Sequence, residues 1–411
     1  MFNLDPSAQE TSHSVGQASR PPLAAYIHFP WCLQKCPYCD FVSFEKEPAK
    51  IEHERYAATV RQEIAHRAAT LEKYELNSVF FGGGTPSLWA PEALGSVLET
   101  LLAAAPHHAD EVEITVECNP SSLDREHAVA LADRGVNRLS VGVQGLDAAR
   151  LRFLGRWHDP EEALCALEAA VASVKRVSGD LIYGVAARDP EHAQRPEEAA
   201  AEVERVADTG VEHISAYALT IEDETRFGTL ARQGRLPLLG DDVVAESFLA
   251  VRETLEARGM RHYEVSNYAV RGQESRHNAA YWQGHDYLGL GCAAFGTLSE
   301  GDGLGRRYRN PLTPRRYFAA AEAGTFAPSF AEELSPETRL LERLMLGLRM
   351  CDGLDIGRAS RELKLDPLFN PKRQTRVDAL LADGKLERDG DRLRIPPHAW
   401  LHADGIVAEL F

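Results

Sequence analysis

The chain has 411 residues, 44% of them hydrophobic, and a formal net charge of −17. Its length allows two or three domains, one of which could be a barrel of more than about 200 residues. The acidic balance argues against a dedicated nucleic-acid-binding protein and against tight adsorption on anionic lipid, although it leaves peripheral membrane contact open. The sequence has no run of about 18 apolar residues, so we expect no transmembrane helix.

The first 22 residues are rich in serine, glutamine and other polar residues and end in Pro21 and Pro22. A secretory signal begins with basic residues and continues with an apolar core, and this segment has neither. We expect residues 1–22 to form a disordered tail.

Three cysteines follow the first apolar run, Ala24–Phe29. They are Cys32, Cys36 and Cys39, in a C-x3-C-x2-C arrangement. Thiolates at this spacing in a tight loop can converge on one inorganic centre. A set of three suits a four-iron cluster with one open iron better than a closed tetrahedral zinc site. The alternatives are three buried thiols or a partial zinc site.

The other four cysteines are scattered, and we expect them to be buried thiols: Cys118, Cys165, Cys292 and Cys351. Seven cysteines in this distribution do not form the framework of a disulfide-rich secreted protein. Because free thiols that hold a metal cluster need a reducing compartment, we expect a cytoplasmic location.

Strands and helices alternate along the first half of the chain. The predicted strands are Ala24–Phe29, Asn77–Phe81, Glu113–Cys118, Arg138–Gln144, one ending at Asp180–Gly184, and His213–Thr220. The predicted helices are Ile51–Thr70, Pro91–Ala104, Asp124–Arg134, Pro160–Ser173 and Pro196–Thr209. This alternation predicts an α/β fold with a parallel sheet curved as a partial (βα)6 barrel, whose chemistry lies at the carboxyl ends of the strands.

The second half of the chain does not continue this regular alternation of strands and helices. It contains a long amphipathic helix at Asp241–Gly259, a predicted strand at His262–Tyr268, a short helix within Pro311–Gly324 and a predicted linker at Pro328–Ser335. Three helices and a hairpin are then predicted: Pro336–Met350, Ile356–Leu363, Arg373–Asp383 and Lys385–Ile395. They suggest a C-terminal α+β winged-helix-like domain, which we interpret as a packing or lid domain rather than a DNA-binding one. The expected domains are 1–22 (tail), 23–235 (barrel), 236–334 (extension) and 335–411 (C-terminal domain).

Several strand ends carry residues suited to ligand binding. Gly82–Thr85 follows the second strand, and glycine lets the backbone approach a ligand closely, although a plain tight turn is the alternative. Glu117 and Gln144 end the third and fourth strands. The amide of Gln144 offers a donor and an acceptor for polar ligand edges.

A second constellation is His277–Trp282, with the sequence HNAAYW. Imidazole is a heme-iron ligand, and flanking aromatic rings could stack on a flat macrocycle. The alternative is a histidine satisfied within the core.

The segment Tyr26–Phe41, YIHFPWCLQKCPYCDF, resembles the cluster loop of the radical S-adenosylmethionine (SAM) superfamily. In that superfamily the methionine part of SAM chelates the open iron, and electron transfer cleaves SAM to a 5′-deoxyadenosyl radical. The sequence of this segment is similar to that of the oxygen-independent coproporphyrinogen III oxidase-like family, and within it to the HemW heme chaperones. The HN-x2-YW segment of these chaperones is matched by His277–Trp282. The resemblance implies a (βα)6 partial barrel, a [4Fe-4S] cluster on Cys32, Cys36 and Cys39, SAM, and heme.

The resemblance also implies which residues contact SAM. The matching positions are Tyr26, Tyr38, Gly83, Gly84, Thr85, Glu117, Gln144, Arg156, Asp180 and Ala218. It implies that the glycines contact the methionine amino group and that Glu117 accepts from the ribose hydroxyls. His277 is the candidate heme ligand. The alternatives are purely structural roles: core packing for the two tyrosines and surface ion pairs for Arg156 and Asp180.

Two functions from different classes fit this resemblance. One is a chaperone that delivers heme to respiratory proteins, and the other is a coproporphyrinogen III dehydrogenase that oxidatively decarboxylates two propionates. The enzyme's motif usually continues with a further cysteine where this chain has Phe41, and the HN-x2-YW segment belongs to the chaperones. We therefore favour the chaperone, assign no catalytic residue, and leave open whether the protein is also an enzyme. The expected partners are heme, heme-receiving proteins and an electron donor such as a flavoprotein, with no nucleic acid.

One loop departs from the family pattern. After Asp180–Gly184 the family usually has Leu-Pro-Gly-Gln, whereas this chain continues with Val185–Pro190, VAARDP. The departure puts the structure of this loop in doubt, and with it a second SAM site.

Overall fold

A computed structural model describes residues 20–299, 304–365, 368 and 370–411. The predicted tail, 1–22, lies almost wholly outside these residues, but Pro22 already belongs to the first strand, so the predicted tail is too long at its end. None of the helices in the described part of the chain combines the length and hydropathy needed to cross a membrane.

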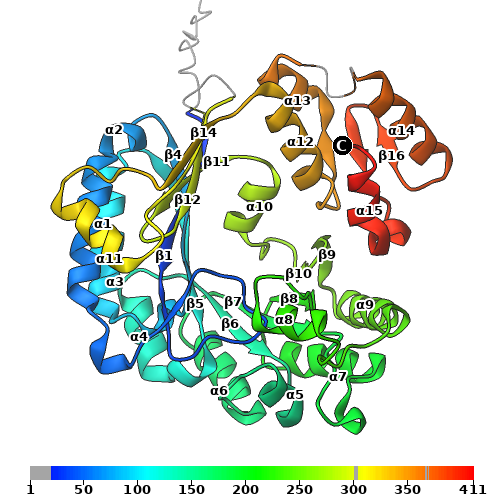
Figure 1. The fold of residues 1–411 in the computed structure, drawn as a ribbon, viewed down its shortest axis with the longest axis horizontal. Coiled ribbons are helices and arrows are strands. Elements are labelled where there is room, and N and C mark those ends of the chain that lie inside the picture. Colours follow the sequence, from blue (N-terminus) through cyan, green and yellow to red (C-terminus); the bar gives the residue numbers. More distant parts are fainter. Residues whose placement is uncertain (1–19, 300–303, 366–367, 369) are drawn as a thin grey trace, which may run out of the picture.

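One large sheet runs through the molecule (Figure 1). Within the described residues it has 12 strands in the order β14-β13-β12-β11-β1-β4-β5-β6-β7-β8-β10-β9. The bounds are β1 (Pro22–Phe29), β4 (Glu75–Gly83), β5 (His108–Cys118), β6 (Arg138–Gln144), β7 (Arg176–Tyr183), β8 (His213–Ala218), β9 (Arg261–Glu264), β10 (Asn267–Ala269), β11 (Asp286–Leu290), β12 (Phe295–Leu298), β13 (Arg306–Arg309) and β14 (Phe330–Glu333). The six strands β1 and β4 to β8 pair in parallel, as predicted for the partial barrel.

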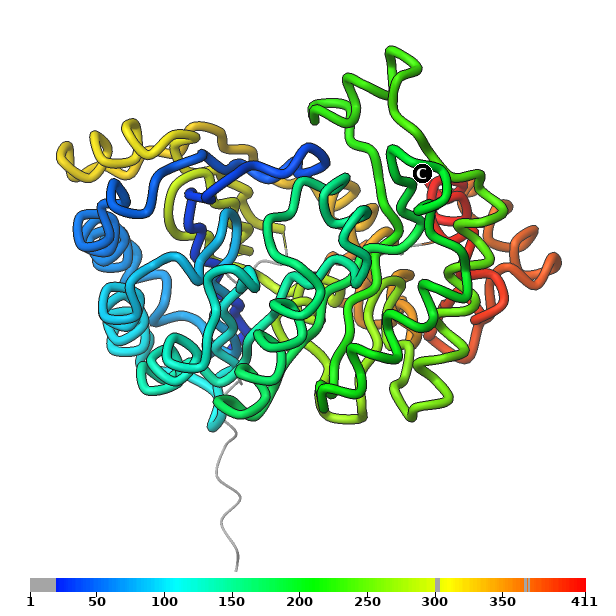
Figure 2. Tube along the Cα trace, turned by 90° about the horizontal axis from the view of Figure 1, so that it is seen from below, coloured from blue at the N-terminus to red at the C-terminus, as the bar shows by residue number. Residues whose placement is uncertain are grey.

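Helices cover the outside of this curved sheet (Figures 1 and 2). They are α1 (His53–His66), α2 (Ala68–Leu71), α3 (Pro91–Ala104), α4 (Arg125–Asp133), α5 (Ala148–Phe153), α6 (Pro160–Val171), α7 (Pro196–Ala207), α8 (Arg226–Arg232), α9 (Asp241–Ala257) and α11 (Pro314–Glu322), whereas α10 (Arg276–Trp282) lies on the inside of the curve. Four of them begin with a proline, whose fixed φ is already that of a first helical turn. At α6 a capping box between Asp159 and Glu162 also satisfies the first free N–H groups.

Two predictions about the second half were wrong. His262–Tyr268 is not one strand, because β9 and β10 pair antiparallel around a tight turn. The buried Glu264 carboxylate holds this turn by accepting from the Ser266 N–H at 3.0 Å and from the Asn267 side-chain amide. The predicted linker Pro328–Ser335 contains β14, which pairs antiparallel with β13 and extends the sheet beyond β1.

The C-terminal segment has the predicted helices and hairpin. It contains α12 (Pro336–Gly347), α13 (Ile356–Leu363), α14 (Pro371–Ala382) and α15 (Ala403–Ala408), with a small sheet of β15 (Leu354–Asp355), β17 (Arg392–Arg394) and β16 (Glu387–Asp389). In Figure 2 this segment, in orange and red, lies beside the green end of the barrel. Trp400 makes one of the contacts between this segment and the barrel, since its ring packs edge-on against His262 with centroids 4.2 Å apart.

Helix α10 occupies the space between the two ends of the curved sheet, close to the centre of Figure 1. Its first N–H groups, from Arg276 and His277, donate to the Glu113 carboxylate at 3.1 and 2.9 Å. Glu113 is 1% exposed and also forms an ion pair with Arg176 at 2.9 Å. Arg176 begins β7, and Glu113 lies on β5 two residues before Thr115, which pairs with the first residue of β6, so α10 is fastened across the base of the barrel.

Candidate functional site

A cavity of about 820 Å³ lies inside the curved sheet, a volume ordinary for a cofactor pocket. All the residues that the sequence predicts for a cluster, SAM or heme line it: Cys32, Cys36, Cys39, Tyr26, Tyr38, Gly83, Gly84, Thr85, Glu117, Gln144, Arg156, Asp180, Ala218 and His277. The three predicted groups of residues therefore share one chamber.

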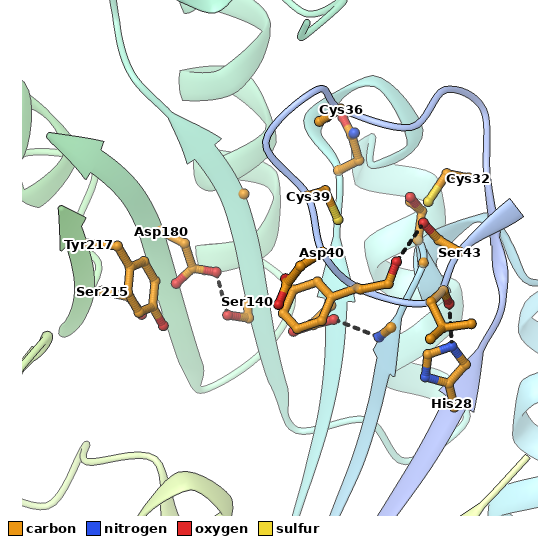
Figure 3. Close-up of a pocket in the computed structure, with 18 of the residues that line it drawn as sticks. His28, Cys32, Cys36, Cys39, Asp40, Ser43, Ser140, Asp180, Ser215 and Tyr217 are labelled. Carbon is orange, nitrogen blue, oxygen red and sulfur yellow. Dashed lines mark hydrogen bonds between the residues drawn. The ribbon is translucent and has the colours of Figure 1, made fainter. Parts of the chain in front are cut away.

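The cysteine loop lies at one side of this cavity (Figure 3). It connects the short strands β2 (Trp31–Cys32) and β3 (Phe44–Glu45), which pair in parallel. The Phe44 N–H donates to the Pro30 carbonyl at 2.8 Å, and the Cys39 N–H donates to the Cys36 carbonyl at 3.2 Å. The loop is thus closed at its base, with a tight turn between its last two cysteines.

The chemistry of the thiols fits a cluster. All three are free, and burial raises the pKa of Cys32 and raises that of Cys39 to about 11, so metal binding has to release protons. In the described part of the chain no three histidine, cysteine, aspartate or glutamate side chains are arranged around a single ion. The thiolates of a cluster bind different irons, so three cysteines of one loop facing a shared cavity suit a cluster better than a mononuclear site.

The remaining cysteines divide by burial. Cys118 and Cys292 are buried as expected, and Cys351 is half-buried. For Cys165 the expectation was wrong, because the thiol is exposed on the solvent face of α6 between the buried Leu164 and Ala166.

Gly83 couples the glycine turn to the cysteine loop. Its φ is +108°, and a Cβ there would collide with the His28 ring, so only glycine fits. The His28 Nε2–H donates to the Val42 carbonyl at 2.8 Å, and its Nδ1 accepts from the Tyr26 hydroxyl at 3.0 Å. The absent side chain of Gly83 thus makes room for the ring that holds the far end of the cysteine loop.

Glu117 faces the cavity from the end of β5 and accepts from the Gly83 N–H at 3.1 Å. Burial raises the pKa of Glu117 to about 7, with a smaller contribution from the nearby charge of Asp180. The carboxylate is thus available to accept from ligand hydroxyls only where the pH approaches or exceeds this value.

This shift predicts a pH-dependent stability. Because Glu117 keeps its proton in the folded state up to about pH 7 but loses it near pH 4.5 when unfolded, its contribution to stability is lost as the pH rises through that window. Glu117→Gln should therefore be more stable than the wild type by about 2–3 kcal/mol at pH 8 and nearly equal at pH 5. Denaturant unfolding at both pH values measures this, with Glu99→Gln, an exposed position on α3, as the control. An equal difference at pH 5 and pH 8 would refute the expected effect.

Gln144 and Arg156 both lie next to Gly142 at the end of β6. Gln144 has a φ of +67°, a strained conformation for a side chain with a Cβ, at a bulge where β6 and β7 shift register. Gly142 is needed beneath it, since a Cβ there would lie 2.6 Å from the Gln144 amide nitrogen. The Arg156 guanidinium donates to the Gly142 carbonyl at 3.0 Å and to the Cys36 sulfur at 3.6 Å.

Asp180 lies on β7 and accepts from the Ser140 hydroxyl at 2.6 Å (Figure 3) and from the Ser178 hydroxyl at 2.7 Å. Burial raises its pKa. Within the described residues neither Asp180 nor Arg156 forms a surface ion pair, which was the alternative to a SAM contact.

His277 is 1% exposed and stacks on Phe80 with centroids 4.7 Å apart. Its Nδ1 is hydrogen-bonded to Ser78 at 3.0 Å, and among the described residues its Nε2 has no partner. Burial lowers the pKa of His277 to about 3, so the ring is neutral. The ring therefore has one nitrogen chemically free for a metal, although the atom is enclosed in this conformation.

The loop that departs from the family pattern is packed against the protein. Val185, Ala186 and Ala187 are buried, and the Gln194 N–H donates to the Val185 carbonyl at 3.0 Å. None of the three is among the described residues that line the cavity.

Sequence reasoning missed several cavity residues. Among them are three buried polar residues of the barrel strands, Arg138, Ser140 and Ser215. Arg138, Ser140, Gly142 and Gln144 alternate along β6 and face the cavity together. Counting back from Gln144 in steps of two would have found them, because the side chains of a strand alternate between its faces.

Models of two protein families match the chain. The radical SAM superfamily matches residues 26–195, and the HemN C-terminal domain matches residues 334–402.

Similar proteins cover most of the chain. The heme chaperone HemW of Escherichia coli is 37% identical over 299 residues, which are 72% of this chain and 76% of that protein. The heme chaperone HemW of Mycobacterium tuberculosis is 32% identical over 396 residues, 95% of each chain. The solved structure of coproporphyrinogen III oxidase (HemN) from Escherichia coli, a radical SAM enzyme, covers 95% of this chain and 90% of its own with a TM-score of 0.77. At 21% identity this last likeness shows the fold alone.

Proposed function

The chain belongs to the family of the HemW heme chaperones in the radical SAM superfamily, and from this premise we propose that it binds heme and delivers it to heme-dependent proteins. The observation that carries the proposal is that the cysteine loop and the His277–Trp282 segment, remote in sequence, both contribute side chains to one cavity. A [4Fe-4S] cluster and SAM at the cysteine end, and heme near α10, would then be neighbours.

The cysteines would hold the cluster and leave one iron open for SAM. When bound, the cluster would supply the electron that cleaves SAM. Support for the donor set comes from the free thiols of one closed loop and from Arg156, whose guanidinium donates to the Cys36 sulfur at 3.6 Å.

The strand-end residues would orient SAM. Glu117 would accept from the ribose hydroxyls, and the amide head of Gln144 would fix a polar edge. The remaining proposed contacts surround the same space: Tyr26, Tyr38, Gly83, Gly84, Thr85, Arg156, Asp180 and Ala218.

His277 is the proposed heme ligand. Ser78 holds Nδ1, and the neutral ring leaves Nε2 as the atom that can bind iron. Because Phe80 and Tyr281 pack against the ring, the iron could reach Nε2 only after one of these aromatic side chains moves.

We further propose a cytoplasmic location, heme-dependent acceptor proteins and a flavoprotein electron donor. These proposals rest on the reduced thiols and on the electron that the cluster requires. A second SAM site and peripheral membrane contact stay open.

The function is tested with anaerobically reconstituted protein given reductant, SAM, and either heme or coproporphyrinogen III. Heme binding is followed by the Soret band, and porphyrinogen products and 5′-deoxyadenosine are followed by chromatography. Stoichiometric heme binding without protoporphyrinogen is expected. Turnover of coproporphyrinogen III would instead favour the dehydrogenase, which the fold likeness to HemN keeps as the alternative.

The ligand is tested by His277→Ala, which should weaken heme binding and change the Soret band. The control is His213→Ala, which removes a buried barrel imidazole held by Ser178 and Tyr263 and outside the cavity lining. An unchanged heme affinity and spectrum in His277→Ala would remove this residue from the site.

A further inference from the structure

Arg138 is a buried cation that no side chain or carbonyl of the described residues bonds. It is 2% exposed, begins β6 and lines the cavity. Among the described residues no hydrogen bond or ion pair reaches its guanidinium, and its Nε is enclosed without an acceptor. The neighbouring Arg176 also has a buried Nε without an acceptor, but its terminal nitrogens pair with Glu113 at 2.9 Å and donate to the Glu274 carbonyl.

Burying an unpaired guanidinium costs considerable free energy, so this side chain calls for a functional explanation. Glu117 and Asp180 are close enough for the charge of Arg138 to act on them, but neither bonds it. Their oxygens are held instead by the Gly83 N–H and by the hydroxyls of Ser140 and Ser178. The planar guanidinium thus keeps its donors for an acceptor brought in by a ligand, and a carboxylate fits such a fork best.

The position of Arg138 separates it from the cysteine end of the cavity. It faces inward at the first residue of β6, and Gln144 faces inward at the last. Six residues of strand span roughly 20 Å. A SAM carboxylate chelated at the cluster would therefore lie toward the opposite end of β6 from the Arg138 backbone.

The electrostatics of this inner end favour an anion. Arg176 is neutralised by Glu113, and burial lowers the pKa values of His213 and His277, so both rings are uncharged. Desolvation also raises the pKa values of Glu117 and Asp180, which reduces the negative charge facing Arg138.

Between the two ends the wall is aromatic. Tyr26 stacks on Phe80 at 6.3 Å, Phe80 stacks on His277 at 4.7 Å, and Tyr281 meets Tyr287 edge-on at 4.6 Å. All of them line the cavity. A flat apolar ring with a carboxylate at its edge would match this wall and the cation beyond it.

We propose that Arg138 binds a propionate carboxylate of a tetrapyrrole at the inner end of the cavity. The inference rests on the proposed function, because it takes heme as the ligand, and it adds the residue that recognises the edge of the macrocycle. It predicts that heme binding depends on the propionate groups as well as on the iron.

The test compares ferric heme with ferric heme dimethyl ester, whose propionates cannot ionise, in the same detergent. The wild type should bind heme roughly 10- to 100-fold more tightly than the ester, as expected for a charge-assisted bidentate contact. Arg138→Met should bind heme about as weakly as the ester and show no preference, whereas Arg138→Lys should keep part of it. Equal preference in the wild type and Arg138→Met overturns the inference.

Two further measurements separate binding from folding. Arg138→Met should keep or raise the thermal midpoint, because it removes an unpaired buried charge, whereas the matched control Arg176→Met should lower it and keep the preference for heme over the ester. A drop in Arg138→Met as large as that in Arg176→Met would assign Arg138 to the fold and overturn the inference.

The other sources of a carboxylate give different results. A loss of SAM affinity in Arg138→Met with heme affinity unchanged would assign the guanidinium to SAM and overturn the inference. A wild type that binds neither heme nor its ester would overturn the proposed function together with this inference. Heme binding that is insensitive to Arg138 overturns the inference alone.

Discussion

Replacing any one of Cys32, Cys36 and Cys39 with alanine is expected to abolish the iron–sulfur cluster, from about four irons per chain to nearly none. We expect all four irons to be lost, because an incomplete ligand set leaves a second iron open to solvent and the cluster then degrades. The loop has no fourth cysteine to replace a missing thiolate, since the position two residues after Cys39 is Phe41. Iron and sulfide content and the visible absorption of anaerobically reconstituted protein measure the effect.

Cys118→Ala is the matched control. Cys118 also lines the cavity and is 6% exposed, but it lies on β5 and not on the cysteine loop. Its S–H group donates a hydrogen bond to the Val116 carbonyl at 3.5 Å. The variant should keep a full cluster. If Cys118→Ala lost as much iron as Cys32→Ala, or if Cys32→Ala kept its iron, the assignment of the ligands would be wrong.

The barrel could be predicted from the sequence because its six parallel strands are covered by helices and read as apolar runs between helical patterns. The glycine, acid and amide residues at the strand ends then located the cavity, since the carboxyl ends of parallel strands meet at one edge. The structure places these residues around one chamber. Which of them touch SAM stays a prediction.

The extension of the sheet could not be predicted in the same way. β11 carries Gly289 within a glycine-rich stretch, so it resembles a loop, and its place beside β1 is decided by tertiary pairing. A Cβ at Gly289 would collide with the Phe295 carbonyl, so the glycine serves the close approach of β12 rather than flexibility. β14 was missed because its exposed residues lack the apolar run of a buried strand.

Arg138 was missed for a related reason. A charged residue at the start of a predicted strand is typical of a solvated strand end, and only the folded partial barrel shows that this end is buried under α10. His277 was found from its sequence segment, yet its enclosure by Phe80 and Tyr281 depends on contacts that no spacing rule specifies.

The base of the barrel supplies the second large expected effect. Glu113→Gln should destabilise the protein by about 3–5 kcal/mol, because it leaves the buried Arg176 guanidinium without its counter-charge. The same substitution weakens the acceptor of the Arg276 and His277 N–H groups, so α10 should loosen. Denaturant unfolding measures the first effect, and hydrogen exchange of residues 276–282 measures the second.

Glu111→Gln, two residues earlier on the same strand, is the matched control for Glu113→Gln. Glu111 also contacts Arg276, at 3.1 Å, but this pair is exposed, with side-chain exposures of 44% and 63%, so its loss should cost at most about 1 kcal/mol. If the two variants were destabilised equally, the Glu113 pair would not be what fastens α10. If Glu113→Gln loosened α10 without changing heme affinity, Glu113 would only support the fold. His277 would then not be a heme ligand that depends on Glu113 for its position.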